Sequence, residues 1–159
     1  MKVVILGATG GTGLEIVRQA IERGHSVTAL VRSPEKLHGY AGFIRIKQGS
    51  PLNASELEEI LEGQDAVLSA FGPRVPIAKK DATLLRNFAT ALTTAMARAG
   101  TKRVIVESTA FLFKDSIVPP TYLLGRLLFP GVVADASAME DILKRSGLDW
   151  TGPWCDLRD

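Results

Sequence analysis

The chain has 159 residues, 46% of them hydrophobic, which suits one domain with a buried core and is too apolar for a disordered chain. Its 19 Lys and Arg nearly balance its 17 Asp and Glu, and a net charge of +2 argues against broad binding to nucleic acid or to a membrane surface. One cysteine excludes an internal disulfide framework and a cysteine-based zinc site, and two histidines in separate segments argue against a metal centre.

The first residues, MKVVILGATGG, do not have the pattern of a secretory signal. Their apolar run is short and leads into glycines instead of a cleavage site. No apolar run in the chain approaches the roughly 18 residues of a membrane span. We therefore expect a cytoplasmic protein that does not bind membranes.

Short apolar runs alternate with helical patterns along the chain. The runs at residues 3–6, 27–31, 43–46, 66–70 and 104–106 have the length and composition of strands. Between them, apolar residues recur at spacings of three and four, as on one face of a helix. The predicted helices carry Leu14, Val17, Ala20 and Ile21; Leu57, Ile60 and Leu61; a long stripe of Leu85, Phe88, Leu92, Ala95, Met96 and Ala99; and Met139, Ile142 and Leu143.

Residues typical of helix caps indicate where the predicted helices begin and end. Asn53 or Ser55 is a candidate cap for the second helix, and Ser137 is the candidate cap for the last one. Glycines stand where each of the four helices should end, at Gly24, Gly63, Gly100 and Gly147.

Alternating strands and helices with short connections imply a parallel sheet covered on both faces. We predict a single α/β domain over residues 1–159, a Rossmann-type doubly wound sheet with strand order 3-2-1-4-5. Gly152 and Pro153 interrupt the place of a sixth strand, so that strand is expected to be incomplete. Ligands of such sheets bind beyond the carboxyl ends of the strands, and the residues there are the candidate site.

The first strand is followed by GATGGTG, which contains Gly7, Gly10, Gly11 and Gly13. A dinucleotide cradle needs a tight turn, close approach of backbone to pyrophosphate and close packing of helix on strand, and glycine permits all three. The following helix would direct its unpaired amides at the phosphates, and Thr9 and Thr12 would add hydroxyl bonds. The alternative is a plain strand-to-helix turn.

The second strand is followed by Arg32 and Ser33, where NAD-preferring sites usually carry an acidic residue for the ribose hydroxyls. A guanidinium matches a dianionic 2′-phosphate in charge and in geometry. The sequence therefore predicts NADP(H) as the cofactor. The alternative is a solvated surface arginine.

Three further strand ends complete the candidate site. Ser50 and Pro51 are expected beside the adenine, and the segment Ala70, Phe71 and Gly72 beside the pyrophosphate and the nicotinamide ribose. Ser108 and Thr109 follow the fifth strand and are the predicted catalytic residues, because their hydroxyls can fix the nicotinamide or donate to a substrate carbonyl. Each of these segments also suits an ordinary strand end with no ligand near it, and the hydroxyls of Ser108 and Thr109 would then bond to the chain's own backbone.

These motifs resemble the atypical short-chain dehydrogenase/reductase superfamily, in its NmrA-like and flavin reductase (biliverdin reductase B)-like branch. The similarity rests on GATGGTG, LVRSP, GQDAVLSAFG, RVIVESTAFLF, the following VPP and SGLDWT, in that order. The resemblance implies an NADPH-dependent reductase of flavins or similar flat acceptors. It places the family's cofactor positions at Gly7, Thr9, Gly10, Thr12, Gly13 and Arg32, and its active-site serine at Thr109.

The chain departs from this family in three places. Ser50 stands where the family often has an aspartate that addresses the adenine. The Tyr-x-x-x-Lys pair of the classical dehydrogenases is missing, and Tyr122 with Arg126 does not replace it. After Trp150 and Thr151 the family pattern stops, which predicts shortened substrate-side elements at an end that is either native or truncated.

Three functions are consistent with these patterns. The first is an enzyme that transfers hydride from NADPH to a small-molecule, flavin-like acceptor. The second is a non-catalytic, NmrA-like sensor that binds NADP(H) and signals to a protein partner. The third is a domain that binds no nucleotide. No nucleic-acid partner is expected, and the sequence leaves the oligomeric state open.

Overall fold

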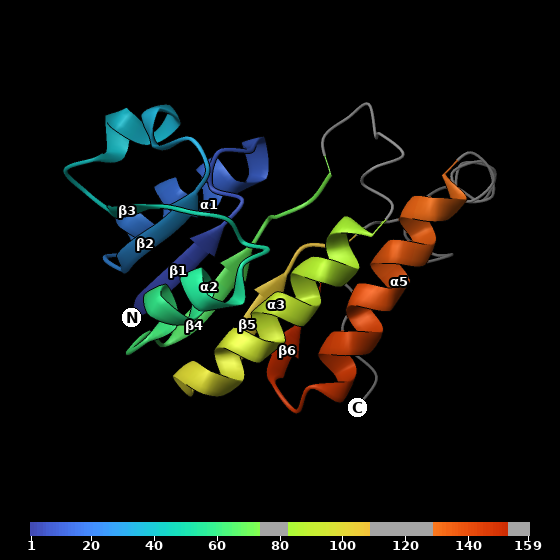
Figure 1. Cartoon of the computed structure of the whole chain (residues 1–159). Helices are drawn as coiled ribbons and strands as arrows, with labels where there is room; N and C mark the ends of the chain where they lie inside the picture. Colours follow the sequence, from blue (N-terminus) through green and yellow to red (C-terminus); the bar gives the residue numbers. More distant parts are fainter. Residues whose placement is uncertain (74–82, 109–128, 153–159) are drawn as a thin grey trace.

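A computed structural model describes residues 1–73, 83–108 and 129–152 of the chain. In this part, a six-stranded sheet has the order β3-β2-β1-β4-β5-β6, with every neighbouring pair parallel (Figure 1). The predicted strand order is confirmed, and a sixth strand joins the sheet beside β5. The strands are β1 (Lys2–Leu6), β2 (Ser26–Val31), β3 (Arg45–Gln48), β4 (Ala66–Ser69), β5 (Arg103–Val106) and β6 (Asp149–Thr151).

Helices cover both faces of the sheet. On one face lie α1 (Gly11–Glu22) and the short 3-10 helix η1 (Pro34–Tyr40), and on the other lie α2 (Ala54–Leu61), α3 (Leu84–Ala99) and α5 (Pro130–Arg145). The alternation of side chains along β1 shows the two layers: Val3 and Ile5 belong to the core under α1, whereas Val4 and Leu6 belong to the core under α3. A strand buried on both faces reads as a continuous apolar run, which is why VVIL was recognisable.

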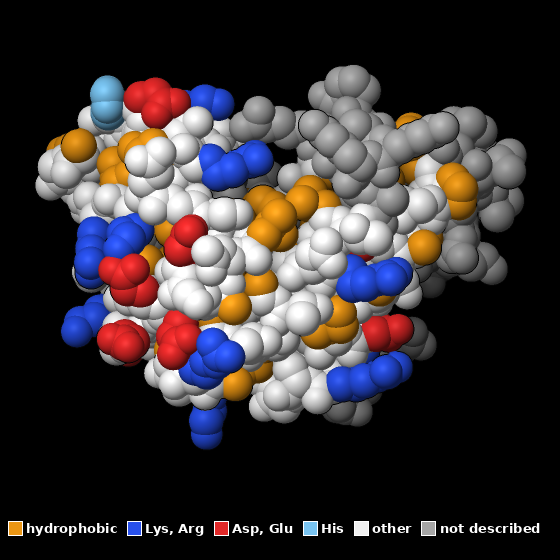
Figure 2. Space-filling model, viewed as in Figure 1, with side chains coloured by type: hydrophobic (Ala, Val, Ile, Leu, Met, Phe, Trp, Pro, Cys, Tyr) orange, Lys and Arg blue, Asp and Glu red, His pale blue; other side chains and the backbone are white. Residues whose placement is uncertain are grey.

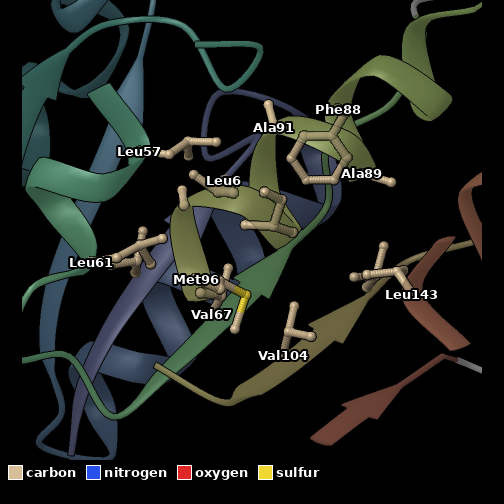
Figure 3. Close-up of a cluster of buried hydrophobic side chains, with 14 of the residues drawn as sticks. Leu6, Leu57, Leu61, Val67, Phe88, Ala89, Ala91, Met96, Val104 and Leu143 are labelled. Carbon is tan, nitrogen blue, oxygen red and sulfur yellow. The ribbon is translucent and has the colours of Figure 1, made fainter. Parts of the chain in front are cut away.

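The larger core lies under α2, α3 and α5. Figure 3 shows Leu57 and Leu61 of α2, Met96 of α3, Val67 of β4 and Val104 of β5 in one cluster of buried side chains. All of these side chains are almost completely buried. The predicted stripe of the long helix is therefore confirmed as its core-facing side, and Gly100 ends that helix with a positive φ of 75°.

The third strand and the last helix differ most from their predicted bounds, whereas the limits of the other four predicted strands differ by at most one residue. The third strand begins at Arg45 instead of residue 43, because the amides of Phe43 and Ile44 bond to the carbonyl of Tyr40 and close a turn after η1. Phe43 is left 70% exposed. The last helix begins at Pro130, so Ser137 lies inside α5 and the prediction that it caps the helix is wrong.

Asn53 is the cap of α2, as one of the two predicted alternatives. Its Oδ1 accepts hydrogen bonds from the backbone N–H of Ser55 at 3.0 Å and of Glu56 at 3.4 Å.

None of the helices in the described segments is both long and apolar enough to span a membrane. Basic and acidic side chains are intermixed over the face shown in Figure 2.

Asp135 fixes the start of α3 from a distant part of the chain. It is 2% exposed on α5, and its two carboxylate oxygens accept the backbone N–H groups of Leu85 at 2.8 Å and Arg86 at 3.1 Å. Thr83, the residue at the α3 N-cap, makes no side-chain capping bond. The buried carboxylate thus takes the place of a local cap and also favourably meets the positive end of the helix.

Replacing Asp135 with alanine should lower the free energy of unfolding by about 2–3 kcal/mol, because two buried amides lose a charged acceptor. Asp135→Asn retains one acceptor oxygen and should cost about half as much. Chemical denaturation measures both values. Asp141→Asn, an exposed carboxylate on the same helix, is the control and should change stability by less than about 0.5 kcal/mol. Equal stability of Asp135→Ala and the control would show that the two bonds do not hold α3.

Candidate functional site

The carboxyl ends of four strands lie in one row. Leu6 of β1 pairs with Leu30 of β2 and with Ser69 of β4, and Ser69 pairs in turn with Val106 of β5. The loops that follow these strands therefore start side by side along one edge. Three strand spacings of about 4.8 Å separate β2 from β5, which is roughly 14 Å and within the reach of an extended dinucleotide.

The glycine-rich turn leaves no room for side chains at two positions. Gly7 has a φ of 77°, and a Cβ there would lie 2.5 Å from the carbonyl oxygen of Ala70. A Cβ at Gly13 would lie 2.1 Å from the carbonyl oxygen of Gly7. The first contact brings the turn against the end of β4, and the second packs α1 onto the turn. The positive φ of Gly7 and the close packing at Gly13 match the roles of the first and last glycines of a dinucleotide cradle, which are the tight turn and the close approach of the helix.

The N-terminus of α1 opens onto the same edge. Gly10 is the N-cap residue and has no side chain to cap the helix, and the first turn contains no acidic residue. Gly10 donates its N–H to the carbonyl of Gly7 at 3.0 Å, which closes the turn. The first amides of α1 lack a side-chain cap, and together with the helix dipole they favour an anion. The residues present therefore fit a pyrophosphate.

Gly10 and Gly11 have a different role from Gly7 and Gly13. A Cβ at Gly10 would meet the Gly7 carbonyl oxygen at 3.4 Å, which is an ordinary contact, and a Cβ at Gly11 would meet nothing within 4 Å. Both residues are exposed. Sterics inside the protein do not require glycine at these two positions, so bare backbone there is available to a ligand.

The two threonines of the turn have different surroundings. Thr9 is half-buried in the turn, and Thr12 is exposed in the first turn of α1. The Thr12 hydroxyl donates to Oε1 of Glu107 at 3.5 Å, which links α1 to the segment after β5. The glycine turn and the end of β5 are thus in direct contact.

Arg32 directly follows β2 and is exposed. Among the described residues, no carboxylate lies within ion-pair distance of its guanidinium. Its backbone carbonyl accepts a hydrogen bond from the Gln48 side chain at 3.5 Å. Ser33 precedes η1 and provides no side-chain cap to it. The charged group of Arg32 is therefore available to an anionic ligand at this edge.

The residues after β3 form hydrogen bonds within the turn that leads to α2. The backbone N–H of Ser50 donates to Glu56 Oε2 at 2.6 Å, and its hydroxyl accepts the N–H of Leu52 at 3.3 Å. Pro51 is buried. The Ser50 hydroxyl still has a proton to donate, so its predicted place beside an adenine stays a prediction.

The segment after β4 offers backbone more than side chains. The Ala70 carbonyl is the group that meets Gly7, and the Phe71 ring packs on Phe88 with centroids 4.8 Å apart. The Phe71 ring thus belongs to the core. Gly72 is exposed, and a Cβ there would have open space around it. Any ligand contact of these three residues would be made chiefly by their main chain.

Ser108 lies two residues beyond β5 and is half-buried. Its hydroxyl donates to Oε1 of Glu140 at 2.6 Å. Glu140 lies on α5 and is 7% exposed. The predicted residue Thr109, like Tyr122 and Arg126, lies outside the described residues. Within residues 1–73, 83–108 and 129–152, no group of three or more His, Cys, Asp or Glu is arranged to hold a metal ion.

Sequence reasoning missed Glu107 and Glu140. Glu140 carries a signal that was present in the sequence: it interrupts the apolar side of α5, where Ala136, Met139 and Leu143 are all buried. A carboxylate on a core-facing stripe needs a polar partner. The identity of that partner depends on where the end of β5 meets α5.

Comparison with known proteins gives a family match over most of the chain. A family model described as NAD(P)H-binding matches residues 7–152. YwnB of Bacillus subtilis, itself uncharacterised, is 40% identical over 72 residues, which are 45% of this chain and 32% of YwnB. The photosystem II assembly factor Ycf39 of Synechocystis is 41% identical over 75 residues, 44% of this chain and 22% of that protein. The matches thus span a third or less of the length of these two relatives.

Solved structures agree with the fold. A Burkholderia pseudomallei protein described as exported is 30% identical, with a TM-score of 0.72 over 96% of this chain and 70% of the other. The oxidoreductase ylbE of Lactococcus lactis has a TM-score of 0.77 at 22% identity, over 96% of this chain and 67% of that one. ChuY of Escherichia coli O157:H7, an anaerobilin reductase, has a TM-score of 0.76 at 18% identity, over 96% and 71%. The last two likenesses concern the fold alone.

Proposed function

The chain belongs to the NAD(P)H-binding family, and from this premise we propose that it is an NADPH-dependent reductase whose acceptor is a flavin or a similar flat molecule. The family match confirms the expectation of an NAD(P)H-binding protein. The preference for NADPH, the acceptor and the catalytic activity are our proposals. We also propose a cytoplasmic location, because the reaction would draw on the NADPH made there.

The observation that carries the proposal is the steric exclusion of side chains at Gly7 and Gly13. Their backbone contacts bring the turn against β4 and α1 against the turn. This arrangement directs the uncapped amides of α1 toward the row of strand ends. Arg32 follows the neighbouring strand β2 and supplies a cation with no carboxylate partner among the described residues. A cation in this place favours a 2′-phosphate over free ribose hydroxyls.

These positions assign each part of the dinucleotide to a different element of the protein. NADPH supplies a hydride when it is bound. The amides of α1 would hold the pyrophosphate, Arg32 would hold the 2′-phosphate, and the segment after β5 would contact the nicotinamide end. The protein's contribution is orientation and exclusion of water. A reduced flavin can take its proton from water, so this proposal requires no strong general acid from the chain.

The test is a reductase assay with purified protein, NADPH and riboflavin or FMN, followed by nicotinamide absorbance. Oxidation of NADPH in proportion to protein concentration, above the spontaneous rate, supports the enzyme. Tight NADPH binding by calorimetry without oxidation across several flat acceptors would overturn the enzymatic proposal and favour an NADP(H)-binding regulatory protein. No binding heat with either NADPH or NADH would overturn the cofactor assignment as well.

A further inference from the structure

The hydrogen bond between Ser108 and Glu140 joins the end of β5 to the middle of α5. The hydroxyl oxygen lies 2.6 Å from Oε1 of Glu140, which is a short, charge-assisted distance. Ser108 is half-buried and borders the row of strand ends, whereas Glu140 is only 7% exposed. The pair therefore has one member at the candidate site and one member in the interior.

The surroundings of Glu140 favour its role as an acceptor. Its side chain is 10% exposed and lies between the buried residues Met139 and Leu143 along α5. Its second oxygen, Oε2, lies 3.8 Å from the ammonium of Lys144, one helical turn away. A carboxylate can only accept hydrogen bonds. The single hydroxyl proton of Ser108 is thus used in the hydrogen bond to Glu140.

A serine whose hydroxyl proton is already used in a hydrogen bond presents only lone pairs to a ligand. It can accept a hydrogen bond but cannot donate one. Of the two roles predicted for this hydroxyl, fixing the nicotinamide is compatible with this geometry and donating to a substrate carbonyl is not. The donor group at the nicotinamide end of the cofactor is the N–H₂ of the carboxamide.

We infer that Glu140 is a positioning residue that makes Ser108 the hydrogen-bond acceptor for the carboxamide N–H₂ of the nicotinamide. This inference rests on the proposed function, because it requires the dinucleotide to lie along the strand ends. It assigns a binding role to Ser108 and an orienting role to Glu140, which acts through Ser108 and does not touch the ligand.

The experiment compares the binding of NADP⁺ with that of its 3-acetylpyridine analogue, in which a methyl group replaces the amide N–H₂ and the carbonyl is kept. Dissociation constants are measured by calorimetry, so no turnover is needed. The wild-type protein should bind NADP⁺ about 3- to 10-fold more tightly than the analogue, the effect of one hydrogen bond. Ser108→Ala should abolish the difference by weakening NADP⁺ binding alone.

Glu140→Gln tests the positioning role at nearly constant volume. The glutamine N–H₂ can donate to the Ser108 oxygen, and the Ser108 hydroxyl is then no longer held as a donor to residue 140. The preference for NADP⁺ over the analogue should therefore fall toward that of Ser108→Ala. Matched controls are Asp141→Asn, an exposed carboxylate beside Glu140, and Ser26→Ala, an exposed serine at the start of β2. Both controls should keep the wild-type preference.

The outcomes separate this inference from the proposed function. If neither dinucleotide binds to the wild-type protein, the cofactor assignment fails. If both bind equally well to the wild type, or if Ser108→Ala keeps the wild-type preference, the acceptor role of Ser108 is overturned. If Ser108→Ala loses the preference and a folded Glu140→Gln keeps it, the positioning role of Glu140 is overturned. Should Glu140→Gln not fold, Glu140→Asp takes its place and must weaken the preference by lengthening the bond.

Discussion

Replacing Gly13 with alanine should destabilise the protein and weaken its binding of NADPH. The new Cβ would lie 2.1 Å from the carbonyl oxygen of Gly7 and 2.9 Å from the Cα of Ala8, so the backbone of the turn must move. We expect the free energy of unfolding to fall by about 3 kcal/mol, which for a chain of this size lowers the melting temperature by roughly 6–12 °C. The displaced turn misaligns the amides of α1, and NADPH affinity should fall at least about tenfold.

Thermal unfolding and calorimetric titration with NADPH measure the two effects. The control for stability is Gly11→Ala, since a Cβ at Gly11 meets nothing within 4 Å. Gly11 lies in the first turn of α1, where alanine is the better helix former, so this variant should be as stable as the wild type or more stable by up to about 1 kcal/mol. A Gly13→Ala protein as stable as Gly11→Ala would contradict the tight packing of α1 on the turn.

Replacing Arg32 with alanine should change the choice between the two nicotinamide cofactors. The guanidinium is expected to form charge-assisted bonds with the 2′-phosphate, which NADH lacks. Losing about 1.5–3 kcal/mol weakens NADPH binding about 10- to 100-fold. The affinity for NADH should change by less than about threefold. Calorimetric titration of both cofactors gives the ratio directly.

The matched control for this change is Arg45→Ala. Arg45 is also an exposed cation. It is the first residue of β3, where it lies beside Thr28 of β2 in the strand register, so it lies toward the opposite edge of the parallel sheet. It should leave both affinities within about twofold, and raising the salt concentration should reduce the NADPH preference of the wild type toward that of Arg32→Ala. Equal losses of NADPH and NADH in Arg32→Ala would show that Arg32 does not recognise the 2′-phosphate.

Much of the fold could be predicted because its signals are local. The run of β1 is continuous and apolar and that of β2 is interrupted only by Thr28, since both strands are buried on both faces, and the stripe on α3 follows the helical period. Right-handed crossovers then leave few strand orders to choose among. The start of β3 was misplaced because Phe43 resembles a strand residue, while its amide closes the turn after η1.

By itself, the sequence determined the alternation of strands and helices, the backbone freedom of the turn after β1 and the positive charge that follows β2. These are properties of residues that are adjacent along the chain, and parallel pairing carries them to one edge of the sheet. Only the tertiary structure decided that the backbone of Ala70 lies against Gly7, that Asp135 caps α3 and that Glu140 accepts the hydrogen bond from the Ser108 hydroxyl. The physical reason is that each of these contacts joins atoms from separate segments, and no local periodicity or propensity specifies which segments meet.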